Sequence, residues 1–436
     1  MSFLKTPTTT PDTPPEFGPD GPPRRSAAAV FIYITILLDM MAMGVTLPVL
    51  PRLIQGLGGG GADHVARTFG LFATVFAVMQ FLAQPVQGAL SDRFGRRPVI
   101  LASNFGLGVD YLVMALAPTL PWLFLGRVIS GAAAGSFTAA SAYMADISEA
   151  EDRAGGFGQI FGAASLGIIL GPALGGMLAS LDMRAPFWVA AILSLANAMY
   201  GLFVLPESLK KANRAPVVLS QLNPVGGLAY LIKRYPVLLG MVTVVFLYGL
   251  TWQGVNPLFT IYSTYRYAWK PADIGLFLAA LGAMNFAVSS WAIQPITRRL
   301  GERMTTLVGM GLQSVSLILF GLAGQSWLFW TALPFLCVGS ISGPAWQAIV
   351  SNMVGPNEQG RLAGAFGGMF SIAGMAAPIA FTSLFALAVG RHATNGAWLG
   401  APFFVAAALS IVALGLAAWA TRHTGTAETE RTSGGA

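Results

Sequence analysis

Three charged side chains lie inside long apolar stretches of the sequence: Asp39, Asp110 and Arg127. Where such a stretch crosses a membrane, a charge at its centre costs at least about 2.5–3.5 kcal/mol, so each residue is a candidate for function. An apolar setting disfavours the ionised form of a carboxylate, and a nearby arginine favours it. An aspartate held between these influences can take up and release a proton, which predicts proton coupling. The alternative is a structural Asp110–Arg127 pair that only holds two helices together.

The stretches around these residues are predicted to cross a membrane. Hydrophobic residues make up 55% of the 436 residues and charged residues only 10%, whereas a soluble domain carries about 25% charged residues. So few charges cannot cover a chain of this length in water, so lipid must cover much of it. A span needs about 20 apolar helical residues. Twelve such segments lie near 28–50, 68–90, 98–117, 121–144, 157–180, 186–205, 236–258, 273–296, 304–324, 327–350, 361–388 and 397–420. We therefore predict an all-α membrane protein.

The basic residues indicate how these segments are oriented. Cytoplasmic loops of membrane proteins are enriched in lysine and arginine. With the N-terminus inside, the tails and the even-numbered loops carry 18 of the 25 basic residues, and the opposite face carries six. Both termini are therefore predicted to be cytoplasmic. The net charge of +7 then follows from topology, and we expect no nucleic-acid partner.

The longest predicted loop, 206–235, divides the chain into two six-helix halves. The halves cover 26–205 and 236–420, with a disordered cytoplasmic tail at 1–25 and a second tail at 421–436. They resemble one another, since 90–97 follows the second segment and the similar run 296–303 follows the eighth. Two parallel repeats place a substrate site at their interface, near the middle of the membrane. This organisation predicts alternating-access transport of a small molecule by a chain that acts as a monomer.

The loop after the second segment combines glycines, an acid and arginines at fixed offsets. Its candidate gating residues are Gly88, Asp92, Arg93, Gly95, Arg96 and Arg97. Asp92 can accept hydrogen bonds from the N-terminus of a neighbouring helix, and the arginines can pair with acids at the same face, such as Asp146. Arginines alone are typical of any cytoplasmic loop. The glycines and Asp92 favour a gate instead.

Two further sets of residues lie inside predicted spans. The fifth segment carries small residues that let helices pack closely: Gly167, Gly171, Pro172, Gly175 and Gly176. The second half has charges only at the first residue of a predicted span, Asp273 and Arg361, and none well inside one. Its substrate-binding candidates are Tyr248, Trp252, Gln253, Asn256, Asn285, Gln313, Trp346 and Gln347. An amide can hydrogen-bond a substrate but cannot carry a proton. The alternative role of each amide is packing between helices. The single cysteine and three scattered histidines offer no metal cluster, and we expect neither metal nor cofactor.

These motifs resemble those of a known family. The run Gly88–Arg97 is similar to the signature loop of the major facilitator superfamily, and Gly167–Gly176 is similar to the antiporter motif of its drug/proton exchanger branch. Gly126–Gly131 looks like the arginine motif of that branch. With Asp39–Gly44 and Val109–Tyr111, the pattern is close to the bacterial tetracycline efflux antiporters. The resemblance is dense over 30–210 and looser as far as 420.

The resemblance implies two six-helix bundles around a central cavity. It also implies proton-coupled efflux of a hydrophobic or amphipathic small molecule, tetracycline-like or of several drug classes, across a bacterial inner membrane, and no enzymatic activity. The chain departs from the tetracycline exporters at Asn285 and Gln313, where that family has a histidine and an aspartate. Tetracycline itself and that family's coupling route therefore do not follow from the resemblance. A proton symporter that imports a polar metabolite is the alternative on the same fold. A non-transporting receptor is a third possibility, against which Asp39 and Asp110 argue.

Overall fold

A computed structural model describes residues 22–147, 153–209, 214, 238–353, 359–392 and 396–421. Every regular element within these residues is a helix. The helices of the first half are α1 (Pro22–Thr46), α2 (Leu50–Gly58), α3 (Ala62–Phe94), α4 (Arg96–Leu116), α5 (Leu120–Ala133), α6 (Ser136–Ile147), α7 (Arg153–Leu181) and α8 (Ala185–Val204). Those of the second half are α10 (Leu238–Tyr267), α11 (Pro271–Ala287), η3 (Val288–Ala292), α12 (Ile293–Leu322), α13 (Ser326–Gly339), α14 (Ser342–Asn352), α15 (Gln359–His392), α16 (Gly396–Leu399) and α17 (Ala401–Ala420).

Ten stretches of the described chain are long and apolar enough to cross a membrane. One of them, Pro271–Leu322, contains 52 residues and is interrupted at Gly301, whose φ of 75° is not helical. Dividing this stretch at Gly301 and adding the 30-residue α10, which is not among the ten, gives twelve long helical segments in the described chain. The predicted tails and most of the predicted linker 206–235 lie outside the described residues.

Helix ends follow local chemistry where they differ from the predicted segments. The first segment was predicted to continue to residue 50, but α1 ends at Thr46 and a separate helix, α2, begins at Leu50. Pro48 and Pro51 explain the interruption, because proline lacks a backbone N–H and disfavours the helical conformation of the residue before it. Pro51 lies in the first turn of α2, where proline is tolerated. The short α2 then occupies what was predicted as a loop.

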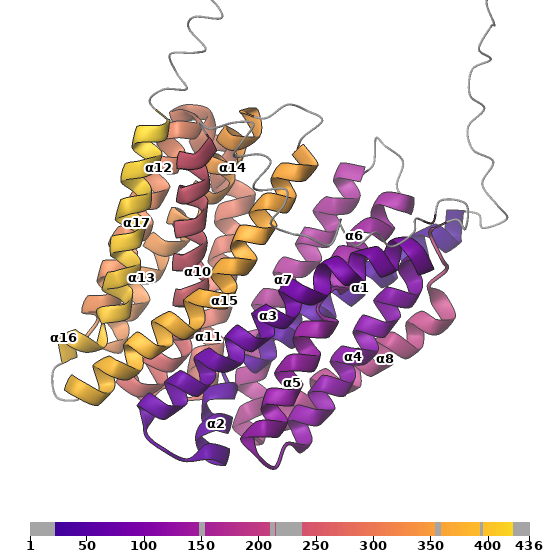
Figure 1. Cartoon of the computed structure of the whole chain (residues 1–436), viewed down its shortest axis with the longest axis horizontal. Helices are drawn as coiled ribbons and strands as arrows, with labels where there is room; N and C mark the ends of the chain where they lie inside the picture. Colours follow the sequence, from indigo (N-terminus) through magenta and orange to yellow (C-terminus); the bar gives the residue numbers. More distant parts are fainter. Residues whose placement is uncertain are drawn as a thin grey trace, which may run out of the picture.

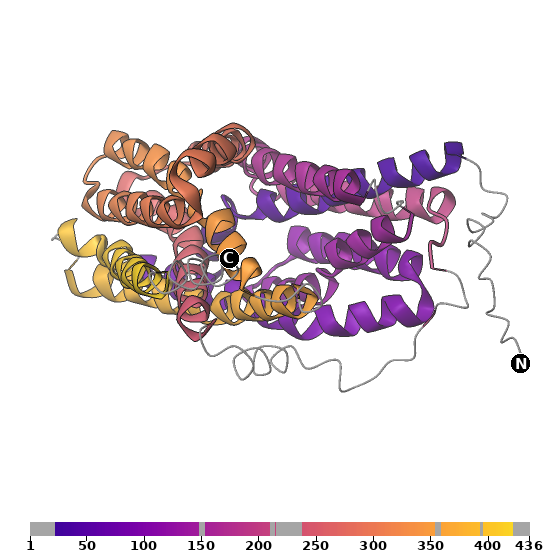
Figure 2. The ribbon, with the colours of Figure 1, turned by 90° about the horizontal axis from the view of Figure 1, so that it is seen from above.

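The helices form two groups that meet at one end of the molecule (Figures 1 and 2). The described chain begins at Pro22 and ends at Thr421 on the same end, which we call the terminal end; the opposite end, with α2 and α16, is the far end. At the far end Arg52 Nη2 donates to the Trp269 carbonyl oxygen at 2.9 Å, and a hydrogen bond of 3.0 Å joins Thr74 Oγ1 to the Met375 carbonyl. These bonds connect the first half to the second.

The buried apolar residues show the same division. One cluster at the far end contains residues of both halves, such as Phe72 and Phe259. Toward the terminal end there are two separate clusters, one around Tyr143 in the first half and one around Trp346 in the second. The halves therefore share a core at the far end and part from one another toward the terminal end.

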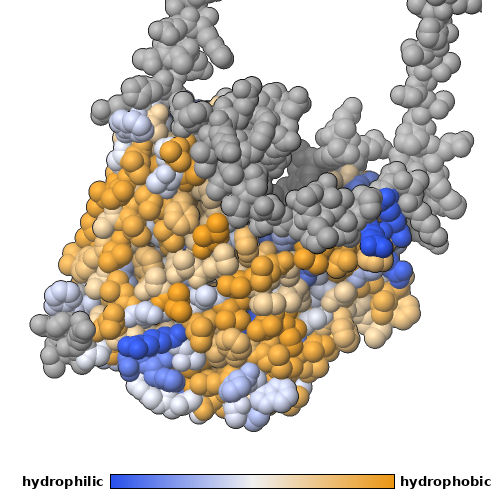
Figure 3. All heavy atoms as spheres, viewed as in Figure 1, coloured by the Kyte–Doolittle hydropathy of each residue, from blue (hydrophilic) through white to orange (hydrophobic). Residues whose placement is uncertain are grey.

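The outer surface is apolar over the length of the helices. Leu181 and Phe203 are each 82% exposed, and hydrophobic residues cover most of the face in Figure 3, with hydrophilic residues concentrated near the ends. Exposed apolar patches of this extent mark contact with a partner or a membrane. With ten apolar helices of spanning length, the surface is that of a protein surrounded by lipid.

Candidate functional site

The fourth membrane-spanning segment is broken in the middle, and the break positions Asp39. Helix α5 ends at Ala133 and α6 begins at Ser136, with Ala134 and Gly135 in a turn. The buried Ser136 hydroxyl donates a hydrogen bond to Asp39 Oδ2 from α1. Because the N-terminus of a helix favours negative charge, the first residue of α6 is a favourable neighbour for a carboxylate. Asp39 is only 6% exposed.

The second acid lies on the other side of the same break. Arg127, on α5, approaches Asp110 of α4 with Nη2 3.4 Å from Oδ2, and both side chains are buried. The guanidinium also lies 2.7 Å from the Met114 sulfur and 5.9 Å from the centre of the Phe76 ring. Among the described residues, Asp110 Oδ1 and Arg127 Nε have no hydrogen-bond partner. The predicted pair is present, but its geometry is loose for a pair that serves only stability.

Tyr111 follows Asp110 on α4, and its phenol is buried. The structure thus brings Asp110 and Arg127 together and places Asp39 against the other part of the same broken helix. The sequence did not indicate Ser136, because serine is not unusual in an apolar helix.

The run Gly88–Arg97 was predicted as a loop, but Gly88–Phe94 is the end of α3 and Arg96 begins α4. Ion pairs centred on Arg96 hold this run, for which we keep the name 88–97 loop. The Arg96 guanidinium pairs with Asp92 and, at 3.2 Å, with Asp146 Oδ2. The expected pairing of this loop with Asp146 is therefore present, whereas Asp92 binds Arg96 rather than a neighbouring helix N-terminus. Gly95 separates α3 from α4 with a φ of 112°, a conformation that only glycine adopts readily.

The other residues of this loop have different surroundings. Arg97 donates to the Leu202 carbonyl oxygen at 2.6 Å, and Arg93 lies 5.3 Å from the centre of the Phe94 ring. A Cβ added at Gly88 would meet open space. Only Arg97 thus ties the loop to α8 directly.

Glu207 is a member of this cluster that the sequence did not reveal. Its Oε1 accepts the backbone N–H of Arg96 at 2.8 Å, at the start of α4. The neighbouring Ser208 hydroxyl donates to Asp146 Oδ2 at 3.0 Å. The chain that leaves α8 therefore caps α4 and contacts the gating cluster. No local pattern predicts this, because Glu207 is 111 residues from its partner.

The small residues of α7 serve two different interfaces. A Cβ at Gly167 would lie 2.6 Å from the Leu37 carbonyl oxygen of α1, and one at Gly171 would lie 2.9 Å from Gly44 Cα. Gly175 continues this contact along α1. Pro172 faces both helices, since a Cβ at Gly44 of α1 would lie 2.7 Å from its Cδ and one at Gly275 of α11 would fall on its carbonyl oxygen. Gly176 instead contacts α11, where a Cβ at Gly275 would lie 3.2 Å from Gly176 Cα. Helix α7 therefore joins the helix that carries Asp39 to the second half.

The substrate-binding candidates of the second half are only partly brought together. Tyr248 of α10 and Trp346 of α14 pack edge to face with ring centroids 6.2 Å apart, and Tyr248 shares a hydrogen bond with Ser342. Trp346 is 1% exposed, and its Nε1 has no partner among the described residues. It is thus a core side chain in this arrangement rather than a cavity surface.

The amides are distributed over several helices. Asn256 donates to the Trp252 carbonyl oxygen of its own helix at 2.9 Å, a bond that contacts neither a substrate nor a neighbouring helix. Gln253 packs against Gly374 of α15. Gln313 is buried and Asn285 half-buried, each with an unpartnered side-chain oxygen, whereas Gln347 is exposed. Among the described residues, Asn285 and Gln313 thus keep free hydrogen-bonding capacity.

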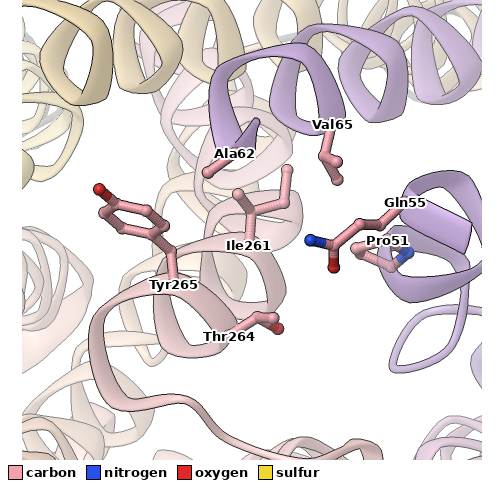
Figure 4. A pocket seen from close by; sticks show the side chains of 7 residues that line it. All are labelled: Pro51, Gln55, Ala62, Val65, Ile261, Thr264 and Tyr265. Atoms are coloured by element: carbon pink, nitrogen blue, oxygen red, sulfur yellow. The ribbon is translucent and has the colours of Figure 1, made fainter. Parts of the chain in front are cut away.

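A small crevice lies between the halves at the far end (Figure 4). Its volume is about 180 Å³, and its lining comes from α2, α3 and α10: Pro51, Gln55, Ala62, Val65, Ile261, Thr264 and Tyr265. The crevice contains none of the predicted coupling or binding residues. It belongs to the closed contact between the halves.

Two bundles that meet at one end, with buried charges in one of them, define a membrane transporter of the alternating-access class. The profile of the Major Facilitator Superfamily matches residues 32–378, and the chain belongs to this family. It is 35% identical to the class C tetracycline resistance protein of Escherichia coli over 387 residues, covering 89% of this chain and 95% of that one. It is also 35% identical to the class G tetracycline resistance protein of Vibrio anguillarum, covering 89% and 96%.

The fold is shared with more distant transporters. A bacterial homologue of the human lysosomal transporter Spinster, in an inward-facing and unoccupied conformation, superposes with a TM-score of 0.75 at 13% identity, covering 92% of this chain and 98% of that one. The resemblance to the major facilitator superfamily and the all-α membrane fold are thus confirmed.

Proposed function

We propose that this protein is a proton-coupled efflux antiporter that exports a hydrophobic or amphipathic small molecule, with tetracyclines as the first class to test. The observation that carries the proposal is the pair of buried carboxylates, Asp39 and Asp110, held by one broken helix of the first half. The relatives named as tetracycline resistance proteins favour export over import by a symporter.

The protein acts in a bacterial inner membrane with the terminal end toward the cytoplasm. The halves 26–205 and 236–420 rock about their shared far-end core, and the cavity between them takes up substrate from the cytoplasmic side. Asp39 and Asp110 carry the protons that move inward when the substrate moves outward, while Arg127 balances the charge of these aspartates. The 88–97 loop stabilises the alternative arrangement in which the terminal end is closed.

The second half contributes neutral contacts to the substrate. Asn285 and Gln313 have unpartnered oxygens among the described residues, so they are available to hydrogen-bond a polar edge of the substrate. Neither titrates. The proton is therefore handled in the first half, which separates this chain from exporters that carry ionisable groups at those two positions.

Uptake of labelled tetracycline, dyes and other drugs into everted vesicles, with and without an imposed proton gradient, tests the function. Gradient-dependent accumulation of at least one compound is expected, and the Asp39→Asn/Asp110→Asn variant should retain only downhill exchange. Purified protein should release protons when the transported compound is added between pH 6 and 9, and the double variant should not. Undiminished proton release by the double variant would place coupling elsewhere.

Orientation is tested separately. In a Cys337→Ser background, single cysteines at Gly59 and Ala212 are exposed to an impermeant thiol reagent in intact cells. The first should be labelled and the second should not, because only the far end faces outward.

A further inference from the structure

The side chain of Gln87 enters the break in the fourth membrane-spanning segment. Gln87 lies on α3, immediately before Gly88, and its Nε2 donates to the Ala132 carbonyl oxygen near the end of α5. The last carbonyl groups of a helix lack partners within the helix. Gln87 therefore supplies from a neighbouring helix the donor that the break leaves missing.

The Gln87 amide occupies the break. A Cβ added at Gly135 would fall on this amide, so a side chain at position 135 would displace it. The other end of the amide is not satisfied, since Gln87 Oε1 is buried without a partner among the described residues. A buried unsatisfied oxygen is unfavourable, and it offsets part of what the hydrogen bond to Ala132 contributes. Stability alone therefore does not account for glutamine at this position.

Gln87 lies between the two parts of the proposed machinery. On one side, α3 runs without interruption from Gln87 to Asp92, so Gln87 moves with the 88–97 loop. On the other side, Gly135 directly precedes Ser136, which bonds Asp39. An apolar groove of about 630 Å³ between α3, α4 and α5 borders Gln87 and Ala132.

The second half, where the structure describes it, has no equivalent of this amide and glycine. The repeat that aligns Leu90 with Ile296 places Ile293 opposite Gln87, and the equivalent break, between α13 and α14, has Ile341 in place of Gly135. Ile293 cannot donate a hydrogen bond to an unpaired helix carbonyl, and the side chain of Ile341 occupies the space that a side chain from another helix would need. The amide and its glycine thus occur in the half that contains the two acids.

We propose that Gln87 is a positioning residue that links the 88–97 loop to Asp39 through the helix break. While the terminal end is open, Gln87 holds the break in the form in which Ser136 bonds Asp39. When α3 shifts as the terminal end closes, the amide withdraws, α6 moves relative to α5, and Asp39 loses the Ser136 hydrogen bond. The proposal rests on the proposed function for its purpose, but the linkage itself can be measured without substrate.

The first test measures whether neutralising Asp39 changes the accessibility of a site near the terminal end. In a Cys337→Ser background, Gly367→Cys places a reporter on α15, where a Cβ meets open space. Its rate of reaction with a maleimide is measured in detergent with Asp39 and with Asp39→Asn. With Gln87 present, we expect Asp39→Asn to change the labelling rate about tenfold, the effect of losing one hydrogen bond to a charged group. In the Gln87→Leu background, we expect Asp39→Asn to change the rate less than about twofold. Equal changes in both backgrounds, or no change with Gln87 present, would overturn the proposal.

Gln84→Leu is the matched control, because it makes the same chemical change three residues earlier on the same helix. It should retain the tenfold response. If it abolished the response as Gln87→Leu does, the effect would belong to α3 in general, and the proposal would be wrong.

The second test uses Gly135 and also covers the case in which Gln87→Leu fails to fold. Gly135→Ala should remove the reporter response when Gln87 is present, because the new methyl group displaces the amide. In a Gln87→Ala background, adding Gly135→Ala should change neither the labelling rate nor the thermal midpoint. Equal effects of Gly135→Ala in both backgrounds would overturn the proposal. A wild-type protein that shows the response but transports no tested compound would refute the proposed function alone.

Discussion

Ser136 and Arg127 lie on the two pieces of one broken membrane helix, and each contacts a different buried aspartate. Ser136 begins α6 and bonds Asp39, whereas Arg127 lies on α5 beside Asp110. A change in the angle between α5 and α6 therefore alters the surroundings of one acid relative to the other. This relationship makes separate predictions for the two sites.

Ser136→Ala should impair gradient-driven export while leaving downhill transport. The substitution removes the hydrogen bond to Asp39, and a hydrogen bond to a charged group contributes about 1.5–3 kcal/mol. We expect gradient-driven accumulation in everted vesicles to fall at least about tenfold. Ser136→Thr keeps the hydroxyl and should retain most of the activity. Equal losses in both variants would mean that packing, not the hydrogen bond, is what Ser136 supplies.

Arg127→Ala should destabilise the protein strongly. It leaves Asp110 buried without its cation, and breaking a buried pair in this way costs about 3–5 kcal/mol. Thermal unfolding in detergent should show a clear loss for Arg127→Ala, and adding Asp110→Asn should recover most of it. If the double variant were no more stable than Arg127→Ala, the pair would not be coupled.

Asp92→Ala should slow turnover more than it weakens substrate binding. Asp92 bonds Arg96 at the terminal end and, in the proposed cycle, stabilises one of two arrangements. The Asp92 side chain is 52% exposed, and an exposed ion pair contributes about 0.2–1 kcal/mol, so its loss shifts such an equilibrium up to about fivefold. Equilibrium binding to purified protein and transport in vesicles measure the two effects. Lost affinity with normal turnover of the remaining complex would contradict the gating role.

Gly171→Ala should reduce stability and export, because its Cβ would lie 2.9 Å from Gly44 Cα and push α7 away from α1. Overpacking of this kind costs about 1–3 kcal/mol. Gly162→Ala is the control on the same helix, since its Cβ would meet nothing within 4 Å. The thermal midpoint should fall for the first variant only. Similar midpoints would show that α1 and α7 tolerate separation.

The features that the sequence predicted are those with a high physical cost. A charge inside an apolar span needs a reason, so Asp39, Asp110 and Arg127 were found without a structure. Likewise, Gly167 and Gly171 recur at a spacing that places them on one helix face. Composition and span length were sufficient for the membrane fold.

The features that the sequence did not predict depend on contacts between distant segments. Ser136 is significant only because the helix is broken beside it, and Glu207 only because the chain after α8 returns to α4. Gln87 carries one signal in the sequence, a polar amide in an apolar span, and its contact with Ala132 joins segments 45 residues apart. Trp346 was predicted to face the cavity and is instead buried, because aromatic residues suit a core as well as a ligand.

Gly176 divides α7 into two parts of unequal length. Its contact with α11 lies near the far end, five residues before Leu181, whereas Arg153 begins the helix at the terminal end. At 1.5 Å per residue, the part toward the far end is about 8 Å long and the part toward the terminal end is about 35 Å long. If α7 rotates by about 10° about Gly176, its far end moves by about 1 Å and its terminal end by about 6 Å. The terminal end can therefore admit a drug-sized molecule while the far end scarcely moves, which keeps the membrane sealed during loading.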